Sequence, residues 1–228
     1  MSTSPMELDV DLGPMPKEGE RFLLQGLRGL LECQELCDVV LVSRGGAAFP
    51  AHRAVLAASS PQMRARVAQP TEQVDGLPAI QLEVEHSEAV KALIDCVYGT
   101  EGEDCDGCYS PSSEAANRDV LTLARQFELS ALEDRASRWL ARNLTTANLL
   151  DRLGTCERFG LKDVKEKILE QLTANTDVLY ELVSNPSVQS VPGVLQDLLL
   201  RVLQLLGCGP SVGGTATKDQ PPKAEVEA

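Results

Sequence analysis

The chain has 228 residues, of which 43% are hydrophobic and only 4% aromatic, and its formal net charge is −13. That hydrophobic content is enough for a folded core, and the scarcity of aromatic residues means that Leu, Val and Ala must fill it. Acidic residues outnumber basic ones by 34 to 21, which argues against nucleic acid or an anionic membrane surface as a partner. A basic protein is the better expectation.

The cysteines and the chain ends bear on the cellular compartment. Seven cysteines, an odd number, are scattered through apolar and loop stretches, as is typical of free thiols in a reducing compartment. Residues 1–20 contain acids and prolines and no signal sequence. The most apolar run, 194–206, contains Asp197 and Arg201 and is too short to span a bilayer. We therefore expect the cytoplasm, the nucleus or both.

After a predicted disordered acidic leader at 1–19, a helix is predicted at 20–32. Its apolar residues cover about 200° of the helical wheel, roughly twice the arc of one packing face. One half of this arc can pack on the chain's own core, and the other half needs a partner. We therefore predict a homodimer whose interface contains Phe22, Leu23, Leu27, Leu30 and Leu31.

The next segments alternate between strand and helix patterns. The β-branched run 37–42 and the return strand 47–50 flank a turn with two glycines, which predicts a hairpin. Ser60 and Pro61 begin a helix as N-cap and first helical residue. The remaining predictions up to residue 98 are a helix at 52–58, an alternating strand at 79–84 and a helix at 87–98.

The second half of the sequence is predominantly helical. A polar, acidic loop is predicted at 101–119, and a disordered tail at 207–228. Ser130 and Glu133 have the spacing of a capping box at the start of one helix. The predicted helices are 120–127, 131–143, 146–158, 161–172, 178–183 and 193–206.

Two sequence runs carry a family resemblance. Residues 36–42 read LCDVVLV and residues 49–61 read FPAHRAVLAASSP, and in this order they resemble the BTB/POZ domain. Residues 119–133 resemble the closing helix pair of that domain, and 149–172 resemble the short BACK-like helical extension of speckle-type and kelch-type relatives. The resemblance implies an α+β BTB/POZ fold, a small sheet flanked by helices, over 20–143. An all-α extension follows over 144–206, and we expect no MATH or kelch domain.

The same resemblance implies a function. BTB/POZ domains dimerise, largely through their first helix, and dock other proteins. Many members are adaptors that hold a substrate on a cullin-RING ubiquitin ligase. The implied partners are a second copy of this chain, a cullin scaffold and an unknown protein substrate. The alternative is a dimeric scaffold without a ubiquitin-ligase role. Neither is an enzyme.

The resemblance also implies a cullin-facing surface. The matching residues are Met63, Val67, Thr71, Gln73 and Tyr98. Adaptors often place a hydrophobic residue, any residue and then Glu after the helix that starts at Ser-Pro. This chain has Thr71 and Gln73 at the two ends of that motif, so the apolar anchor and the acid are both missing.

The remaining chemical candidates have two interpretations each. Asp38 and Arg53 match a charged pair in the family, either a docking pocket or a structural ion pair. His52 has no acid or nucleophile at motif spacing, which favours a packed histidine over a catalytic base. Cys105 and Cys108 are spaced for zinc or a disulfide, but no second pair is suitably spaced and the loop is acidic, which favours an incidental pair. We predict no catalytic, metal or cofactor site.

Overall fold

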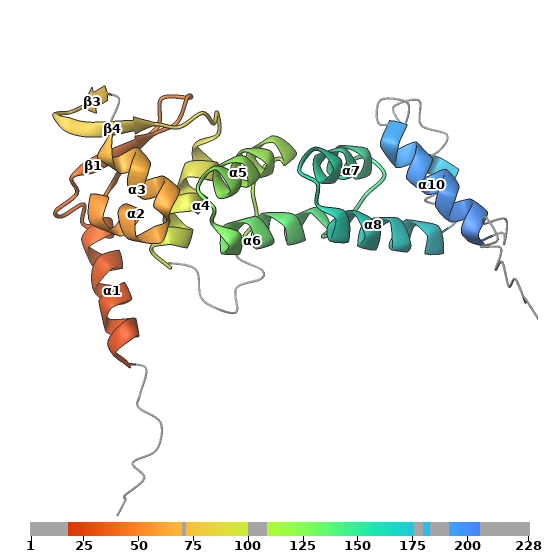
Figure 1. Ribbon diagram of the computed structural model, residues 1–228, viewed down its shortest axis with the longest axis horizontal. Helices are drawn as coiled ribbons and strands as arrows, with labels where there is room; N and C mark the ends of the chain where they lie inside the picture. The colour runs from red at the N-terminus through yellow and green to blue at the C-terminus, as the bar shows by residue number, and fades with distance from the viewer. Residues whose placement is uncertain (1–17, 70–71, 100–108, 176–179, 183–191, 206–228) are drawn as a thin grey trace, which may run out of the picture. The chain divides into compact units, whose positions relative to one another are not determined.

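The computed structural model describes residues 18–69, 72–99, 109–175, 180–182 and 192–205. The chain forms two compact units, one reaching to Ile168 and the other beginning at Leu169, and each is described by itself. This division falls within the predicted helical extension. Figure 1 shows the first unit as a small sheet with helices and the second as helical.

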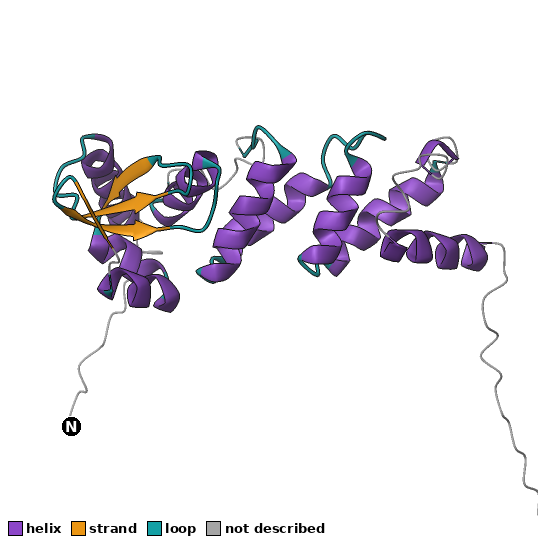
Figure 2. Ribbon diagram, turned by 90° about the horizontal axis from the view of Figure 1, so that it is seen from above, coloured by secondary structure: helices purple, strands orange, loops and turns teal. Residues whose placement is uncertain are grey.

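A four-stranded mixed sheet lies in the first unit (Figure 2). Its spatial order is β2-β1-β4-β3. β1 pairs antiparallel with β2 and parallel with β4, while β3 pairs antiparallel with β4. The strands are β1 (Val39–Val42), β2 (Ala48–Ala51), β3 (Glu72–Val74) and β4 (Leu77–Gln81).

β1 is apolar at every position because both of its faces are covered. All four of its residues are buried. Val40 and Val42 form a buried cluster with Ala79 of β4. The partly buried side chains of Val74 and Leu77 pack against this cluster. Alternate residues of a strand point to opposite faces, so Val39 and Leu41 lie on the other face. A strand covered on both sides reads as a continuous apolar run, which is the pattern of 39–42.

The helices account for most of the described residues, and Figure 1 shows α2 and α3 below the sheet. Their order follows the sequence predictions, with bounds shifted by a few residues. The helices are α1 (Glu18–Glu32), α2 (Arg53–Ser59), α3 (Pro61–Ala68), α4 (Ser87–Val97), α5 (Glu114–Gln126), α6 (Ser130–Leu140), α7 (Leu149–Arg158), α8 (Lys162–Ala174) and α10 (Pro192–Leu205). The predicted α+β class is confirmed.

Helices α4, α5 and α6 pack together beside the sheet. Their inward residues recur at helical spacing and are mainly Leu, Val and Ala, as the composition predicts. Those buried most completely include Val90, Leu93, Val120, Leu121, Ala124, Leu132, Ala136 and Leu140.

Three local predictions differ from the structure. β3 was not predicted, because its three residues are mostly polar and exposed and join the sheet only through β4. The loop at 101–119 ends earlier than predicted, because α5 begins at Glu114 with Ser113 as its N-cap, whose side chain accepts from the Ala116 N–H. The capping box is wrong: Ser130 is already helical, and the Glu133 carboxylate binds the Arg125 Nε at 2.8 Å.

Arg152 of α7 is a buried arginine with several partners. Its side chain is 5% exposed, and its Nε donates to the Glu114 carboxylate of α5 at 2.8 Å. Its Nη1 donates to the carbonyls of Leu140 and Arg142 at the end of α6. Its guanidinium also lies 4.3 Å from the centre of the Trp139 ring. Arg152 thus ties α7 to both preceding helices.

The second unit contains α10 and the end of α8. Val194 and Leu198 are buried, one helical turn apart, and Arg201 pairs with Glu170 at 3.2 Å. Leu199, Leu200 and Leu203 are exposed on α10. The predicted helix at 193–206 is confirmed as α10. Of the predicted helix at 178–183, only residues 180–182 are described, and they are helical.

Candidate protein-interaction surfaces

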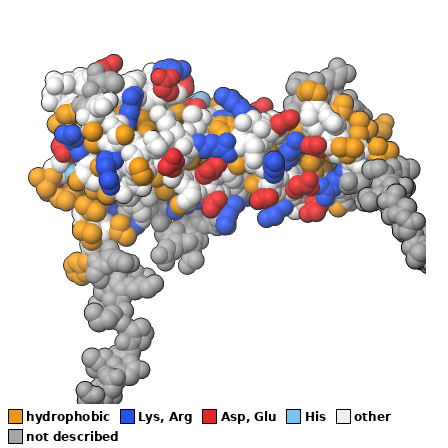
Figure 3. Space-filling view, in the orientation of Figure 1, with side chains coloured by type: hydrophobic (Ala, Val, Ile, Leu, Met, Phe, Trp, Pro, Cys, Tyr) orange, Lys and Arg blue, Asp and Glu red, His pale blue; other side chains and the backbone are white. Residues whose placement is uncertain are grey.

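Most of the large apolar side chains that are exposed among the described residues of the first unit lie on α1. Phe22 is 80% exposed and Leu23 is 66% exposed, and Leu24 is also exposed. Leu27, Leu30 and Leu31 are half-buried. Figure 3 shows hydrophobic side chains gathered along this helix. The predicted excess of apolar surface is therefore present, and it lies mainly at the N-terminal end of the predicted interface.

The inner side of α1 is attached to the end of α4. Arg28 Nε donates to the Tyr98 carbonyl at 3.2 Å. Gly99 has a φ of +59°, and a Cβ there would lie 3.3 Å from Arg28 Nη2 and 3.8 Å from the Leu24 side chain. Glycine at position 99 therefore lets α1 pack close to the end of α4, and it also suits the left-handed backbone.

Tyr98 and His52 form a buried polar cluster. The Tyr98 hydroxyl lies 2.9 Å from the His52 backbone nitrogen and 2.6 Å from its Nδ1. His52 Nε2 lies 2.8 Å from the Glu35 carbonyl and 3.9 Å from the Cys37 thiol. A carbonyl only accepts, so Nε2 carries a proton. In the neutral ring, Nδ1 then accepts from the Tyr98 hydroxyl. His52 is the packed, satisfied histidine that the sequence favoured.

Burial shifts the acidity of this cluster. It raises the pKa of the Tyr98 hydroxyl to about 12, an effect opposed by the N–H bond from His52 and reinforced by Cys37 and Asp38. Burial, with a contribution from Asp38, also raises the pKa of the Cys37 thiol. A thiol with a raised pKa is a poor nucleophile near neutral pH. The cluster therefore has the character of a structural site.

Asp38 and Arg53 meet in a way that neither sequence interpretation described. The Asp38 carboxylate accepts from the Arg53 backbone N–H at 2.7 Å, at the first turn of α2. The Arg53 guanidinium instead donates to the Val67 carbonyl at 3.4 Å. His52, the N-cap of α2, makes no side-chain cap bond, so Asp38 supplies the acceptor from outside the helix. The interpretation as a structural ion pair is corrected to a helix cap, and the docking pocket stays a prediction.

An aspartate from another helix also binds the backbone at the start of α4. Its N-cap is His86, again without a side-chain cap bond. The Asp119 carboxylate of α5 accepts from the backbone N–H groups of Glu85 and His86, both at 3.0 Å, and binds His86 Nδ1 at 2.8 Å. Both histidines of the sequence thus precede helices, and an aspartate distant in sequence binds a backbone N–H at or next to each histidine.

Most of the predicted cullin-facing residues lie inside the fold. Met63 and Tyr98 are fully buried and Val67 is 4% exposed, so the expectation that these three side chains face a partner is wrong. Met63 and Val67 are core residues because α3 packs its apolar side inward, and Tyr98 is buried at the end of α4. Gln73 is exposed in β3. Thr71 lies outside the described residues.

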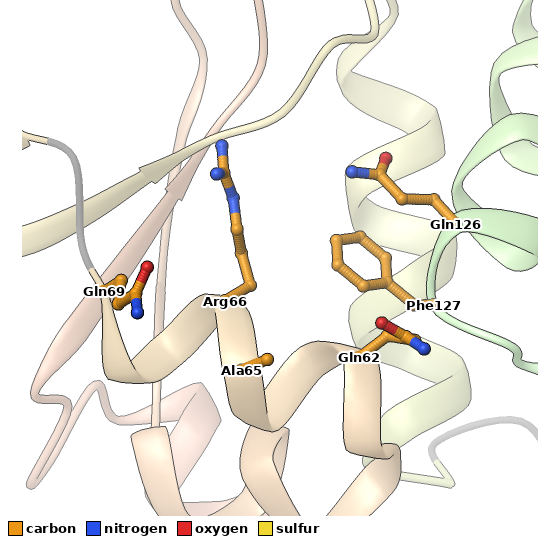
Figure 4. Close-up of a pocket in the computed structure, with 6 residues that line it drawn as sticks. All are labelled: Gln62, Ala65, Arg66, Gln69, Gln126 and Phe127. Carbon is orange, nitrogen blue, oxygen red and sulfur yellow. The ribbon is translucent and has the colours of Figure 1, made fainter.

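The outer side of α3 is polar and borders a shallow groove. The groove has a volume of about 290 Å³ and runs between α3 and the end of α5 (Figure 4). It is lined by Gln62, Ala65, Arg66, Gln69, Gln126 and Phe127. The Arg66 side chain extends toward the sheet and donates to the Gln81 carbonyl at 3.1 Å. The groove therefore offers amide and guanidinium groups.

Other chemical sites gain no support from the described residues. Cys105 and Cys108 lie outside them. Within the described ranges, no three His, Cys, Asp or Glu side chains are grouped to hold a metal ion. None of the helices in those ranges has both the length and the apolar character needed to cross a bilayer.

Comparison with known proteins settles the family. The BTB/POZ domain profile matches residues 27–144, more than half of the chain. The chain belongs to the BTB/POZ family. Human Kelch-like protein 21 is 30% identical to this BTB protein over 158 residues, which are 68% of the chain and 25% of that protein. Kelch-like protein 21 of Rattus norvegicus matches equally.

Two further likenesses are more distant. The human inhibitor of Bruton tyrosine kinase is 26% identical over 171 residues, 73% of the chain and 12% of that protein. The BTB domain of zebrafish PATZ1 superposes with a TM-score of 0.43 at 16% identity, covering 58% of this chain and all of that structure. This BTB chain thus spans about a quarter or less of the curated relatives it matches. The resemblance inferred from 36–42 and 49–61 is confirmed.

Proposed function

We propose that this BTB protein is a homodimeric docking subunit that holds a protein substrate on a cullin-RING ubiquitin ligase. The observation that supports pairing is the exposed apolar end of α1, where Phe22 and Leu23 are mostly uncovered. Large exposed apolar residues grouped on one element normally mark an interface. A symmetric pair covers such a patch with its own copy. The proposal includes a cytoplasmic or nuclear location.

Light scattering of the full chain tests the pairing. Phe22→Asp with Leu23→Asp should convert a dimer into a folded monomer, because both side chains are exposed and neither belongs to the core. Leu27 is half-buried and is left unchanged. Leu199→Asp with Leu200→Asp, on exposed α10 positions, is the matched control and should leave the dimer intact. A wild type that is monomeric at tens of micromolar would refute the pairing.

The ligase role is supported by family membership and is tested by calorimetry with the N-terminal part of a cullin. We place the contact on the exposed side of α3, the groove beside it and Gln73, since Met63 and Val67 face inward. Measurable binding that Arg66→Glu abolishes, with the dimer unchanged, would support this role.

A second candidate is a dimeric BTB scaffold without a ligase role. The observation in its favour is that Gln73 is a neutral, exposed side chain where the adaptor motif ends in an acid, and that three glutamines line the groove beside α3. A hydrophobic anchor at the centre of an interface contributes about 2 kcal/mol or more. Lack of cullin binding by an intact dimer would favour the scaffold.

A further inference from the structure

The second unit has exposed leucines on α10. Among the described residues of that unit, the large hydrophobic side chains that are exposed are Tyr180, Leu199, Leu200 and Leu203. The most exposed of the three leucines is Leu199, at 56%. Figure 3 shows hydrophobic side chains gathered over this helix. Exposed apolar residues grouped on one element normally mark a surface that another molecule covers.

The apolar residues of α10 lie on two opposite sides of the helix. Val194 and Leu198 are buried, and they are close together on a wheel of about 100° per residue. Leu199, Leu200 and Leu203 lie on the opposite side of that wheel. A helix that packs on one side only needs a single apolar stripe. The packing of the described residues therefore does not account for this second side, which we call the outer leucine face.

The C-terminal sequence offers little to cover the outer leucine face. After Leu206, the only large aliphatic residues are Val212 and Val226, which are far apart and surrounded by Gly, Pro, Thr and charged residues. An apolar cover requires residues at the spacing of a helix or a strand. Residues 207–228 lack that spacing, so they do not supply the cover.

The charge of the second unit favours one kind of partner. Residues 169–228 contain seven acidic residues and three basic ones. Among the described residues of this unit, the acids are Glu170, Glu181 and Asp197 and the basic residue is Arg201, which pairs with Glu170 at 3.2 Å. A second copy would bring the same negative charge to the contact. A basic segment would instead meet complementary charge.

We propose that the outer leucine face docks a basic amphipathic helix of a partner protein. This inference rests on the docking role proposed above, for which it names the partner's chemistry and the contact. Leu199 and Leu203 are four residues apart, and Leu200 and Leu203 are three apart, so the three side chains are neighbours on the helix surface. Such a face fits a helix with its own apolar residues at every third or fourth position. Lys or Arg beside those residues then faces the acidic unit.

Three synthetic peptides test the docking, each of about 18 residues so that it can form a helix. The first has Leu at every third or fourth position and Lys elsewhere. The second has Glu in place of Lys, and the third has the composition of the first in an order without helical spacing. In fluorescence anisotropy with the full chain, the first peptide should have a dissociation constant lower than that of either control by about tenfold or more. Equal binding of the first peptide and either control, or no binding of the first, would overturn the inference.

Neutral variants locate the contact. Leu199→Gln with Leu203→Gln removes apolar surface without changing the charge, and it should weaken binding of the first peptide about tenfold or more. Phe22→Gln with Leu23→Gln, on exposed residues of α1, is the matched control and should leave that affinity unchanged. Leu200→Gln alone gives the same test if the double variant on α10 does not fold. An α10 variant that binds like the wild type, or a control that weakens binding equally, would overturn the inference.

The same chain separates this inference from the pairing and the ligase role. A dimer that binds a cullin but not the first peptide would overturn the inference and leave those two roles standing. Binding of the peptide at α10 by a chain that neither pairs nor binds a cullin would support the inference and refute the two roles. A fall in the oligomer mass on Leu199→Gln with Leu203→Gln, seen in light scattering, would show that a second copy covers the outer leucine face and would overturn the inference.

Discussion

The Tyr98 hydroxyl lies within hydrogen-bonding distance of two atoms of His52, its backbone nitrogen at 2.9 Å and its Nδ1 at 2.6 Å. The end of α4 is thereby fixed to the residue that precedes α2. Because His52 Nε2 also reaches the Glu35 carbonyl, the same two residues hold the turn that follows α1. The placement of the proposed self-association surface therefore depends on a cluster in the interior.

Replacing Tyr98 with Phe should destabilise the fold by about 1–3 kcal/mol, the usual cost of leaving buried polar groups without a partner. His52 N–H and Nδ1 would both lose their partner, while the ring would still fill its space. Urea unfolding measures the change. Tyr180→Phe is the control, since Tyr180 is 78% exposed and should change little. A Tyr98→Phe variant as stable as the wild type would contradict the importance of the cluster.

Alkaline pH should weaken the fold through the same hydroxyl. Its pKa is about 12 in the folded chain, against an ordinary value of 10.0. Its stabilising contribution is complete below pH 10, declines as the unfolded chain ionises first, and is lost as pH rises through 12. Stability measured across this window should therefore fall less steeply for Tyr98→Phe than for the wild type. Tyr109, whose pKa burial also raises, accounts for part of the remaining slope.

The cap at α2 gives a prediction with a conservative control. Asp38→Ala should cost about 1 kcal/mol, as for removal of other helix caps. Asp38→Asn keeps an oxygen acceptor for the Arg53 N–H and should retain most of that stability. The Asn variant should also lower the pKa of Tyr98, because the Asp38 charge contributes to raising it. Chemical unfolding and phenolate absorbance measure the two effects separately.

Arg152 should be the most sensitive charged residue of the first unit. Arg152→Met leaves Glu114 and the end of α6 without their partner, and removing one member of a buried pair costs about 3–5 kcal/mol. Arg118 pairs with Asp151 at 3.4 Å near the surface, and Arg118→Met should cost less than about 1 kcal/mol. Equal effects in urea unfolding would show that the buried network contributes little.

Gln73 provides a gain-of-binding test. It is exposed in β3, at the position where the adaptor motif ends in an acid. Gln73→Glu with Thr71→Met should tighten cullin binding, by about tenfold for each 1.4 kcal/mol regained, since both the charge and the apolar anchor would be restored. Calorimetry measures this change, and Glu83→Gln, an exposed residue elsewhere on the unit, is the control. No change in affinity would place the contact elsewhere.

Local patterns were the most reliable part of the sequence analysis. Ser60 and Pro61 were predicted to start a helix, and the Ser60 side chain does accept from the Met63 N–H, because such a cap involves only neighbouring residues. A helix end was predicted at 158, and Gly160, just after α7, has a φ of +58°. The first turn of α5 was missed because its buried Asn117 reads as a loop residue. Its Oδ1 accepts from the Tyr109 hydroxyl and its Nδ2 donates to the Ala136 carbonyl, and both partners lie outside α5.

The predicted sites depended more on tertiary contacts. The excess apolar arc of α1 was visible on a helical wheel, because it requires only helical periodicity. The family motif located α3 correctly, but which of its sides faces inward depends on its packing against other elements such as α2, so Met63 and Val67 were assigned to the wrong surface. Asp38 and Arg53 were recognised as a pair, yet only the fold shows that the acceptor serves a backbone N–H.

The parallel pairing of β1 with β4 has a consequence for synthesis on the ribosome. β2 emerges soon after β1 and can form the hairpin at once, but the second neighbour of β1 follows only after α2, α3 and β3. Until then one edge of an apolar strand has no partner, and such an edge can pair with another chain. Long-range strand pairing is also slow. The nascent chain should therefore be most prone to aggregation, and most dependent on chaperones, between the emergence of β2 and that of β4.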